Sequence, residues 1–207
     1  PENLPPHLPE WSRTLGRGVI EEPYGTRSRH ETAVRRYVPW LTPDRISSVS
    51  FTPLAEMQGI ITPSGLHFER HHGGVPEIDP SDYRLMIHGM VERPLVFTLE
   101  DLKRMPTVSR IHFVECPANG GMEWRGAQMS GVQFTHGMLS CSEWTGVPLK
   151  VLLAQAGLRS GASWLLAEAS DAAHLARSIP LAKALDDAIV AFGQNGEAVR
   201  PQQGYPV

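Results

Sequence analysis

Cysteine is scarce in this sequence of 207 residues, which contains only two, Cys116 and Cys141. Two cysteines cannot form the disulfide framework that holds many small secreted domains together, and a chain of this length can bury one sizeable core without it. The sequence also lacks a C-x-x-C pair. A structural zinc site, which takes four nitrogen or sulfur ligands at short spacing, is therefore not expected.

Long hydrophobic runs and a large charge of one sign are missing as well. The longest stretch without a charged residue, from Gly126 to Ser142, is interrupted by Gln128, Gln133 and His136, so no membrane span is expected. The formal net charge of -3 gives no reason to expect a nucleic-acid partner. The sequence begins at Pro1 without a basic segment and an apolar run, so we expect any export signal to be absent or already removed.

Nucleotide-binding motifs are absent too. Neither a G-x-x-x-x-G-K loop nor a dinucleotide fingerprint occurs, which argues against kinases, other P-loop enzymes and Rossmann dehydrogenases. Hydrophobic residues make up 41% and charged residues 20% of the chain, values close to those of globular proteins. The sequence is therefore expected to fold.

Composition divides the chain into two regions. Residues 1–60 hold eight of the 18 prolines and balance seven acidic against seven basic side chains, which predicts an extended N-terminal arm. A short helix is expected within it over 28–37, and a solvated basic face is favoured there over a partner-docking helix. Residues 61–207 are expected to form the folded domain.

Strands and short helices mix in that domain without the regular alternation of a doubly wound sheet, so we assign the fold class α+β. Thr98 followed by Asp101 has the pattern of a capping box, and Asn195-Gly196 has that of a hairpin turn. The expected strands are 85–89, 111–116 (the best candidate for a buried strand), 164–168 and a hairpin from 189. The expected helices are 99–105, one that has Pro148 in its first turn and Gly157 as its C-terminal cap, and 179–185.

Cys116 is the first candidate functional residue, because the 111–116 strand would end at it and Cys-Pro-Ala-Asn-Gly-Gly surrounds it with small residues. A buried, inert thiol is the commonest fate of a free cysteine. A thiolate metal ligand is the sharper alternative, although one thiolate is too few unless the metal brings its own ligands. A nucleophilic cysteine, with His112 or His136 as base, is a third possibility.

The second candidate is the segment from Phe68 to Pro76. It places Arg70 beside His71 and His72 and a Gly-Gly pair, and a guanidinium fork matches an oxyanion bidentately. A simply solvated His71 is the alternative for that imidazole.

These segments resemble, in order, the motifs of the sulfite oxidase family of molybdenum domains. F-E-R-H-H-G-G-V-P resembles F-x-R-N-H-x-x-x-P, and E-C-P-A-N-G-G resembles the family's cysteine motif. W-T-G-V-P-L, S-I-P-L and R-P-Q-Q-G-Y-P-V follow in the family's order. Within the family, C-P-A-N-G-G-M-E-W-R-G and the proline-rich arm are most similar to the molybdenum subunits of the Sox sulfane dehydrogenases.

The resemblance implies a mixed-sheet molybdopterin-binding domain, with Cys116 as the only protein ligand to molybdenum. Arg70 would face the substrate oxyanion and, with Cys116, serve catalysis. The implied cofactor-binding residues are Phe68, Glu69, Arg70, His71, His72 (toward the pterin), Asp171 and Gln203. The family's pattern continues beyond Val207 with an active-site tyrosine and a dimerisation domain, so part of the site is expected on a further segment.

The implied function is molybdenum-dependent oxidation of sulfur, with sulfane sulfur on a carrier protein as substrate and a c-type cytochrome subunit as electron acceptor. Hetero-oligomer formation and a periplasmic location, reached after cofactor loading, are implied with it. Gly120 stands where many sulfite-oxidising relatives have an arginine, and His71 replaces an asparagine, so free sulfite is less expected. Sulfite dehydrogenase on the same scaffold, a metal-free binding module and a thiol hydrolase are the alternatives.

Overall fold

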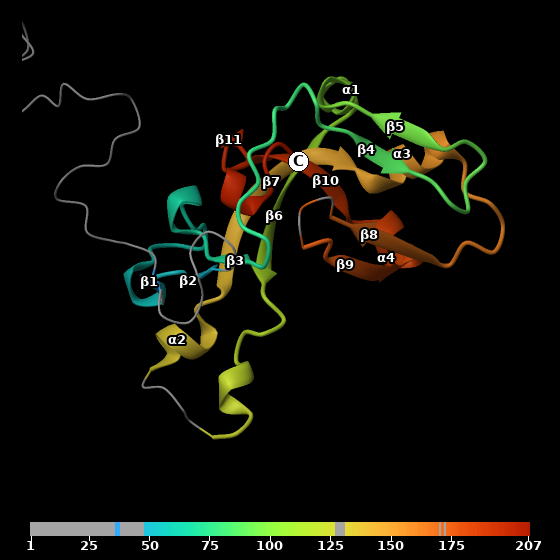
Figure 1. The fold of residues 1–207 in the computed structure, drawn as a ribbon. Coiled ribbons are helices and arrows are strands. Elements are labelled where there is room, and N and C mark those ends of the chain that lie inside the picture. Colours follow the sequence, from blue (N-terminus) through green and yellow to red (C-terminus); the bar gives the residue numbers. More distant parts are fainter. Residues whose placement is uncertain (1–35, 38–47, 127–130, 170, 172) are drawn as a thin grey trace, which may run out of the picture. The chain divides into compact units, whose positions relative to one another are not determined.

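The computed structural model of the chain describes residues 36–37, 48–126, 131–169, 171 and 173–207. The chain divides into a unit from Pro1 to Thr32, which lies outside the described residues, and a unit from Ala33 to Val207, to which all the features below belong. Strands and short helices alternate irregularly in the second unit, which confirms the α+β class (Figure 1).

A four-stranded antiparallel sheet forms the centre of this unit. Its strands, in spatial order, are β11 (Glu197–Ala198), β10 (Ile189–Gln194), β7 (Leu139–Pro148) and β6 (Val108–Glu115). The long β6–β7 pair runs from Val108 opposite Gly146 to Glu115 opposite Leu139 (Figure 1). Cys116 therefore follows directly on the last residue of β6, as the sequence predicts.

The predicted burial of this strand is wrong, because no residue from Ile111 to Glu115 is buried. Ile111 and Phe113 are 52% and 69% exposed, while His112 between them is half-buried. Successive side chains of a strand point to opposite faces, and among the described residues β6 pairs only with β7. An apolar run by itself does not distinguish such a strand at the edge of a sheet from one covered on both faces.

The larger core cluster lies where two helices meet the sheet. Helix α1 (Leu99–Lys103) buries Leu102, and helix α3 (Leu149–Ala156) buries Leu152, both against Phe97 and Val147. The predicted capping box is confirmed, because the Thr98 hydroxyl accepts from the Asp101 main chain and the Asp101 carboxylate accepts from that of Thr98.

Two hairpins and a fourth helix complete the domain around this core. Strand β4 (Leu85–Ile87) pairs with β5 (Leu95–Phe97), strand β8 (Trp164–Glu168) with β9 (Ala176–Pro180), and α4 (Leu181–Asp186) follows β9. The first two residues of the predicted 179–185 helix belong to β9 instead. The β10–β11 turn is confirmed, since Asn195 and Gly196 both have positive φ.

The N-terminal part of the unit is a small sheet in the order β1 (Arg36–Tyr37), β2 (Ser48–Phe51) and β3 (Glu69–His71). Of the predicted 28–37 helix only the last two residues are described, and they form a strand. Of the predicted 1–60 arm, residues 36–37 and 48–60 are described, and β2 pairs with both β1 and β3. The remaining boundary between arm and domain stays a prediction.

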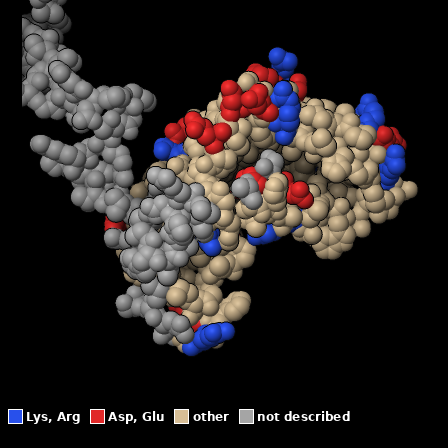
Figure 2. Space-filling model, viewed as in Figure 1, with Lys and Arg blue, Asp and Glu red and all other residues tan. Residues whose placement is uncertain are grey.

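Charge is mixed over the surface. Figure 2 shows small, separate groups of acidic and basic side chains, and no continuous basic stripe crosses the described part of the face it draws. Among the described residues, none of the helices has the length and apolar character that crossing a membrane requires.

Candidate cofactor site

Cys116 is fixed by its main chain at the end of β6. Its N–H donates to the Met138 carbonyl at 3.0 Å, and its carbonyl accepts from the Asn119 N–H at 2.8 Å. The residue is half-buried and packs against the second core cluster, formed by Val49, Phe51, Phe68 and Met138. The main chain of Cys116 is therefore fixed on both sides, while its side chain is left partly exposed.

The turn after Cys116 is held just as closely. The Asn119 amide donates to the Glu115 carboxylate at 2.9 Å and accepts from the Met138 N–H at 3.1 Å. Gly120 has φ +75°, donates to the Thr135 carbonyl at 2.6 Å, and a Cβ there would lie 3.2 Å from His136 Nε2. Position 120 therefore favours glycine, because an L side chain is strained at this φ and its Cβ would press on the His136 ring.

The opposite wall comes from β3 and the residues beside it. The Phe68 N–H donates to Ser140 Oγ on β7 at 3.0 Å, which ties this segment to the central sheet. Glu69 and His71 share one face of β3 and pair at 2.9 Å, whereas Arg70 points to the other face. The Arg70 guanidinium donates to the His71 carbonyl.

These walls enclose a pocket of about 370 Å³. It is lined by His67, Phe68, Glu69, Arg70, His72, Val114, Glu115, Cys116, Pro117, Trp144, Leu175, Arg177, Gln202 and Gln203. Six predicted residues are therefore brought together: Cys116, Phe68, Glu69, Arg70, His72 and Gln203. His71 and Asp171 are not among the lining residues.

The pocket lining carries charges of both signs, Arg70 and Arg177 together with Glu69 and Glu115. The pKa of His72 is lowered from its ordinary value, first by partial desolvation of the imidazole and then by the charges of Arg70 and Arg177, while Asp171 opposes the shift. His72 is therefore expected to be neutral at pH 7. Asp171, although outside the lining, lies close enough to act on the His72 charge.

Two predicted residues carry buried oxygens with no hydrogen-bond partner among the described residues, Gln203 Oε1 and Asp171 Oδ1. The other end of the Gln203 amide donates weakly to the Phe68 carbonyl at 3.4 Å. A buried polar atom without a partner is costly, so its presence beside a pocket points to a ligand that supplies the missing donor.

The pocket includes residues that sequence reasoning did not single out. Trp144, whose Nε1 donates to the His112 carbonyl at 3.3 Å, lies in the W-T-G-V-P-L segment, and Arg177 immediately precedes S-I-P-L. Trp144 lies within one of the family motifs and Arg177 next to another. The motifs alone, however, do not show which side chains face the pocket.

The nucleophile alternative finds no support in this geometry. Within the described residues, neither His112 nor His136 hydrogen bonds to the Cys116 thiol. Instead, His136 Nδ1 lies 2.8 Å from Thr135 Oγ1 and 3.7 Å from the Glu123 carboxylate. A cysteine that acts as a nucleophile needs an adjacent base within hydrogen-bond reach.

Comparison with known proteins identifies the domain. The sequence model of the family described as oxidoreductase molybdopterin binding domain matches residues 72–207. The chain belongs to this family. The resemblance expected from the motifs is thereby confirmed.

Similar proteins give a finer picture of this molybdopterin-binding domain. The crystal structure of the sulfane dehydrogenase SoxCD from Paracoccus pantotrophus is 50% identical, with a TM-score of 0.86 over 97% of this chain and 52% of that chain. NADH nitrate reductases of Ulva prolifera and Volvox carteri are 31% and 34% identical over 72% of this chain and 19% of their own length. The chain thus spans about half of the first relative and about a fifth of the others.

The residues of the pocket fit molybdopterin. Among the residues that the structure describes, no three His, Cys, Asp or Glu side chains gather as a metal site, so Cys116 stands as a single thiol donor. A single donor suits a metal whose other ligands come with its cofactor. The volume is in the range of small-molecule sites, and Gln203 Oε1 offers an unused acceptor to the donor groups of a pterin.

Proposed function

We propose that this chain is the cofactor-binding domain of a molybdenum enzyme that oxidises sulfane sulfur on a carrier protein. The observation that carries the proposal is the 50% identity to a sulfane dehydrogenase over 97% of the chain, against 31–34% to the nitrate reductases over 72–75%.

Each pocket residue has a separate role in this proposal. When bound, molybdopterin supplies two-electron redox chemistry and oxygen-atom transfer. Cys116 holds the metal from the rigid end of β6. Arg70 stabilises negative charge on the substrate, because a preorganised guanidinium in a partly desolvated pocket needs no reorganisation. His72 and Gln203 offer a neutral imidazole and an amide to the pterin.

Position 120 supports a carrier-bound substrate over free sulfite. A small dianion is held best by several guanidinium groups, and Gly120, which has no side chain and does not line the pocket, adds none to Arg70 and Arg177. Val114 and Leu175 are 40% and 43% exposed where they line the pocket, and they suit the apolar parts of a peptide arm.

Partners and location follow from the same proposal. We propose a hetero-oligomer in which electrons leave to a c-type cytochrome subunit, in the periplasm, after cofactor loading and export. These assignments rest on the resemblance to the Sox enzymes. Co-purification of a haem-containing subunit with the full-length protein from the periplasmic fraction would test them together.

Metal analysis tests the cofactor assignment. The full-length protein should contain molybdenum in proportion to chain, Cys116→Ser should lose the metal centre and the activity, and Cys141→Ser should keep both. Cys141 serves as the matched control, because it is also a free thiol but does not line the pocket. Absence of molybdenum from the wild type, or a fully active Cys116→Ser variant, would overturn the proposal.

Steady-state kinetics tests the substrate. We expect a higher kcat/KM with a carrier peptide bearing sulfane sulfur than with sulfite. A strong preference for sulfite would replace the substrate assignment by sulfite dehydrogenase while leaving the cofactor assignment intact.

A further inference from the structure

The pocket contains a second guanidinium, Arg177, which is supplied by an element separate from the Arg70 wall. Arg177 lies on β9, opposite Ala167 of β8, and it lines the pocket together with Leu175 two residues earlier. Leu175, which directly precedes β9, and Arg177 both contribute to the lining of the pocket. Cys116 and Arg70 enter the same pocket from β6 and β3.

We propose that Arg177 binds the anionic sulfur group of the substrate, such as a terminal sulfane anion or a sulfur oxyanion, and works as a pair with Arg70. This inference rests on the proposed function and adds to it the residue that sets the preference for anions. The two guanidinium groups come from different strands, so an anion between them is held by both.

Arg177 is not ion-paired among the described residues, although Glu69 and Glu115 line the same pocket. Within the described residues its one hydrogen bond goes to the neighbouring Ala176 carbonyl at 2.8 Å. Some exposed cations of the unit are paired, such as Lys183 with Asp187 at 2.6 Å and Arg200 with Glu197 at 3.1 Å, whereas Arg84 and Arg93, like Arg177, donate to main-chain carbonyls. Arg177 thus keeps donors that a ligand can use.

The fields of the two arginines overlap in the pocket. Both guanidinium charges act on the His72 imidazole, Arg70 more strongly than Arg177. They therefore lie near the same point, although they come from separate strands. Both also line the same pocket, and an anion that contacts both groups would accept charge-assisted hydrogen bonds from each.

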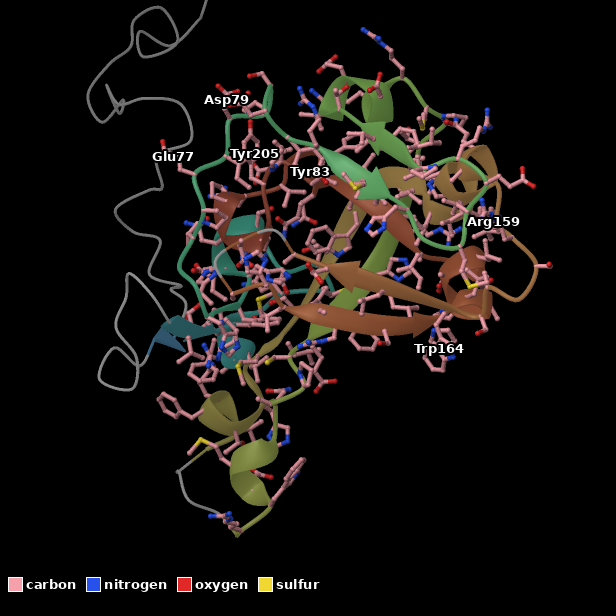
Figure 3. All side chains as sticks on the ribbon, turned by 45° about the vertical axis from the view of Figure 1, so that its right-hand side comes forward. Glu77, Asp79, Tyr83, Arg159, Trp164 and Tyr205 are labelled. Carbon is pink, nitrogen blue, oxygen red and sulfur yellow. The ribbon has the colours of Figure 1, made fainter. Side chains whose placement is uncertain are left out.

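The register of the β8–β9 hairpin explains the position of Arg177. Trp164 and Leu166, at alternating positions of β8, are 64% and 62% exposed, and Ala167 opposite Arg177 belongs to the other face. Figure 3 shows Trp164 at the outer side of this hairpin. A shift of one residue in the pairing would move Arg177 out of the pocket.

The test uses the full-length, molybdenum-loaded protein and its Arg177→Gln, Arg177→Lys and Arg159→Gln variants. Arg159, labelled in Figure 3, is an exposed arginine outside the pocket and serves as the control for loss of one positive charge. Three quantities are measured: the Kd of inorganic sulfate by calorimetry, the KM and kcat for a peptide bearing sulfane sulfur, and the molybdenum content.

Arg177→Gln should weaken sulfate binding and raise KM by roughly 10-fold each, as expected for loss of one charge-assisted hydrogen bond. The molybdenum content should be unchanged, Arg177→Lys should restore part of the affinity, and Arg159→Gln should stay within about twofold of the wild type.

Two results would overturn the inference. One is an Arg177→Gln variant whose sulfate Kd and KM remain within about twofold of the wild type, since one charge-assisted bond is worth more. The other is a variant that loses molybdenum, which would assign the guanidinium to the cofactor. If the wild type oxidises no sulfur compound, the proposed function fails, and the sulfate measurement still decides the role of Arg177.

Discussion

The core around α1 and α3 and the pocket around Cys116 are built on the same sheet, but they treat polar groups in opposite ways. In the core, Leu102, Val147 and Leu152 are fully buried and the start of α1 is capped at both the hydroxyl and the carboxylate. In the pocket, a thiol is half-exposed and the Gln203 amide oxygen is buried without a partner among the described residues. Close packing and complete hydrogen bonding stabilise the core. In the pocket, polar groups without a protein partner are available to a ligand.

The largest effect on folding is expected in the core. Leu152→Ala should lower the free energy of unfolding by about 2–5 kcal/mol, because it removes buried apolar surface and leaves a cavity between α3 and the sheet. Denaturant titration of the full-length protein measures the change. Leu166→Ala makes the same substitution at an exposed position and should have little effect. Equal losses in both variants would refute the contrast between core and surface.

A smaller loss is expected in the turn that carries Cys116. Gly120→Ala should cost about 1–3 kcal/mol, since alanine at φ +75° is strained and its Cβ would crowd His136. Gly121→Ala is the matched control, because its Cβ would meet nothing within 4 Å and its φ is not positive. Thermal melts of both variants should separate them. A Gly121→Ala variant as unstable as Gly120→Ala would contradict this account of the turn.

The N-terminal cap of α1 should contribute less to the free energy of unfolding than the Gly120 turn does. Thr98→Ala is expected to cost about 1 kcal/mol, with Thr107→Ala as a control outside any helix. Hydrogen bonds from Thr98 lower the pKa of Asp101, so the capping interaction stabilises the fold above the ordinary pKa of that carboxyl and is lost as pH falls through the lowered value. The difference between Thr98→Ala and the wild type should therefore shrink in acid. A difference that grows in acid would show that the carboxylate plays no part.

The smallest effect on folding is expected at Gln203, and it should oppose the effect on ligand binding. Gln203→Leu removes a buried oxygen without a partner, so the metal-free protein should be as stable as the wild type or slightly more stable. Cofactor retention during gel filtration should nevertheless fall, because the amide is lost from the pocket. Destabilisation comparable to that of Leu152→Ala would place Gln203 in the core instead.

The core was easier to predict from the sequence than the pocket, for physical reasons. Capping at Thr98, the helix near Pro148 and the Asn195-Gly196 turn each depend on neighbours within a few residues. All three are found, although Pro148 directly precedes the helix instead of lying in its first turn. Only the position of Cys116 at the end of a strand could be predicted for the pocket in the same local way.

Features of the pocket that depend on pairing between distant strands were harder to predict. His71 follows Arg70, but strand alternation turns the two to opposite faces of β3, and His71 pairs with Glu69. Arg177 enters the pocket only through the β8–β9 register. The apolar sequence of β6 predicted burial, yet Phe113 lies on an open face because the strand is at the edge of the described sheet.

The central claim is that the Cys116 thiol is a ligand of the molybdenum in this pocket. X-ray absorption at the molybdenum edge tests it directly in full-length wild type and in Cys116→Ser, reconstituted with cofactor if the variant is purified without it. The account predicts one sulfur neighbour fewer around the metal in the variant and no change in Cys141→Ser. The same number of sulfur neighbours in the wild type and in Cys116→Ser would contradict it.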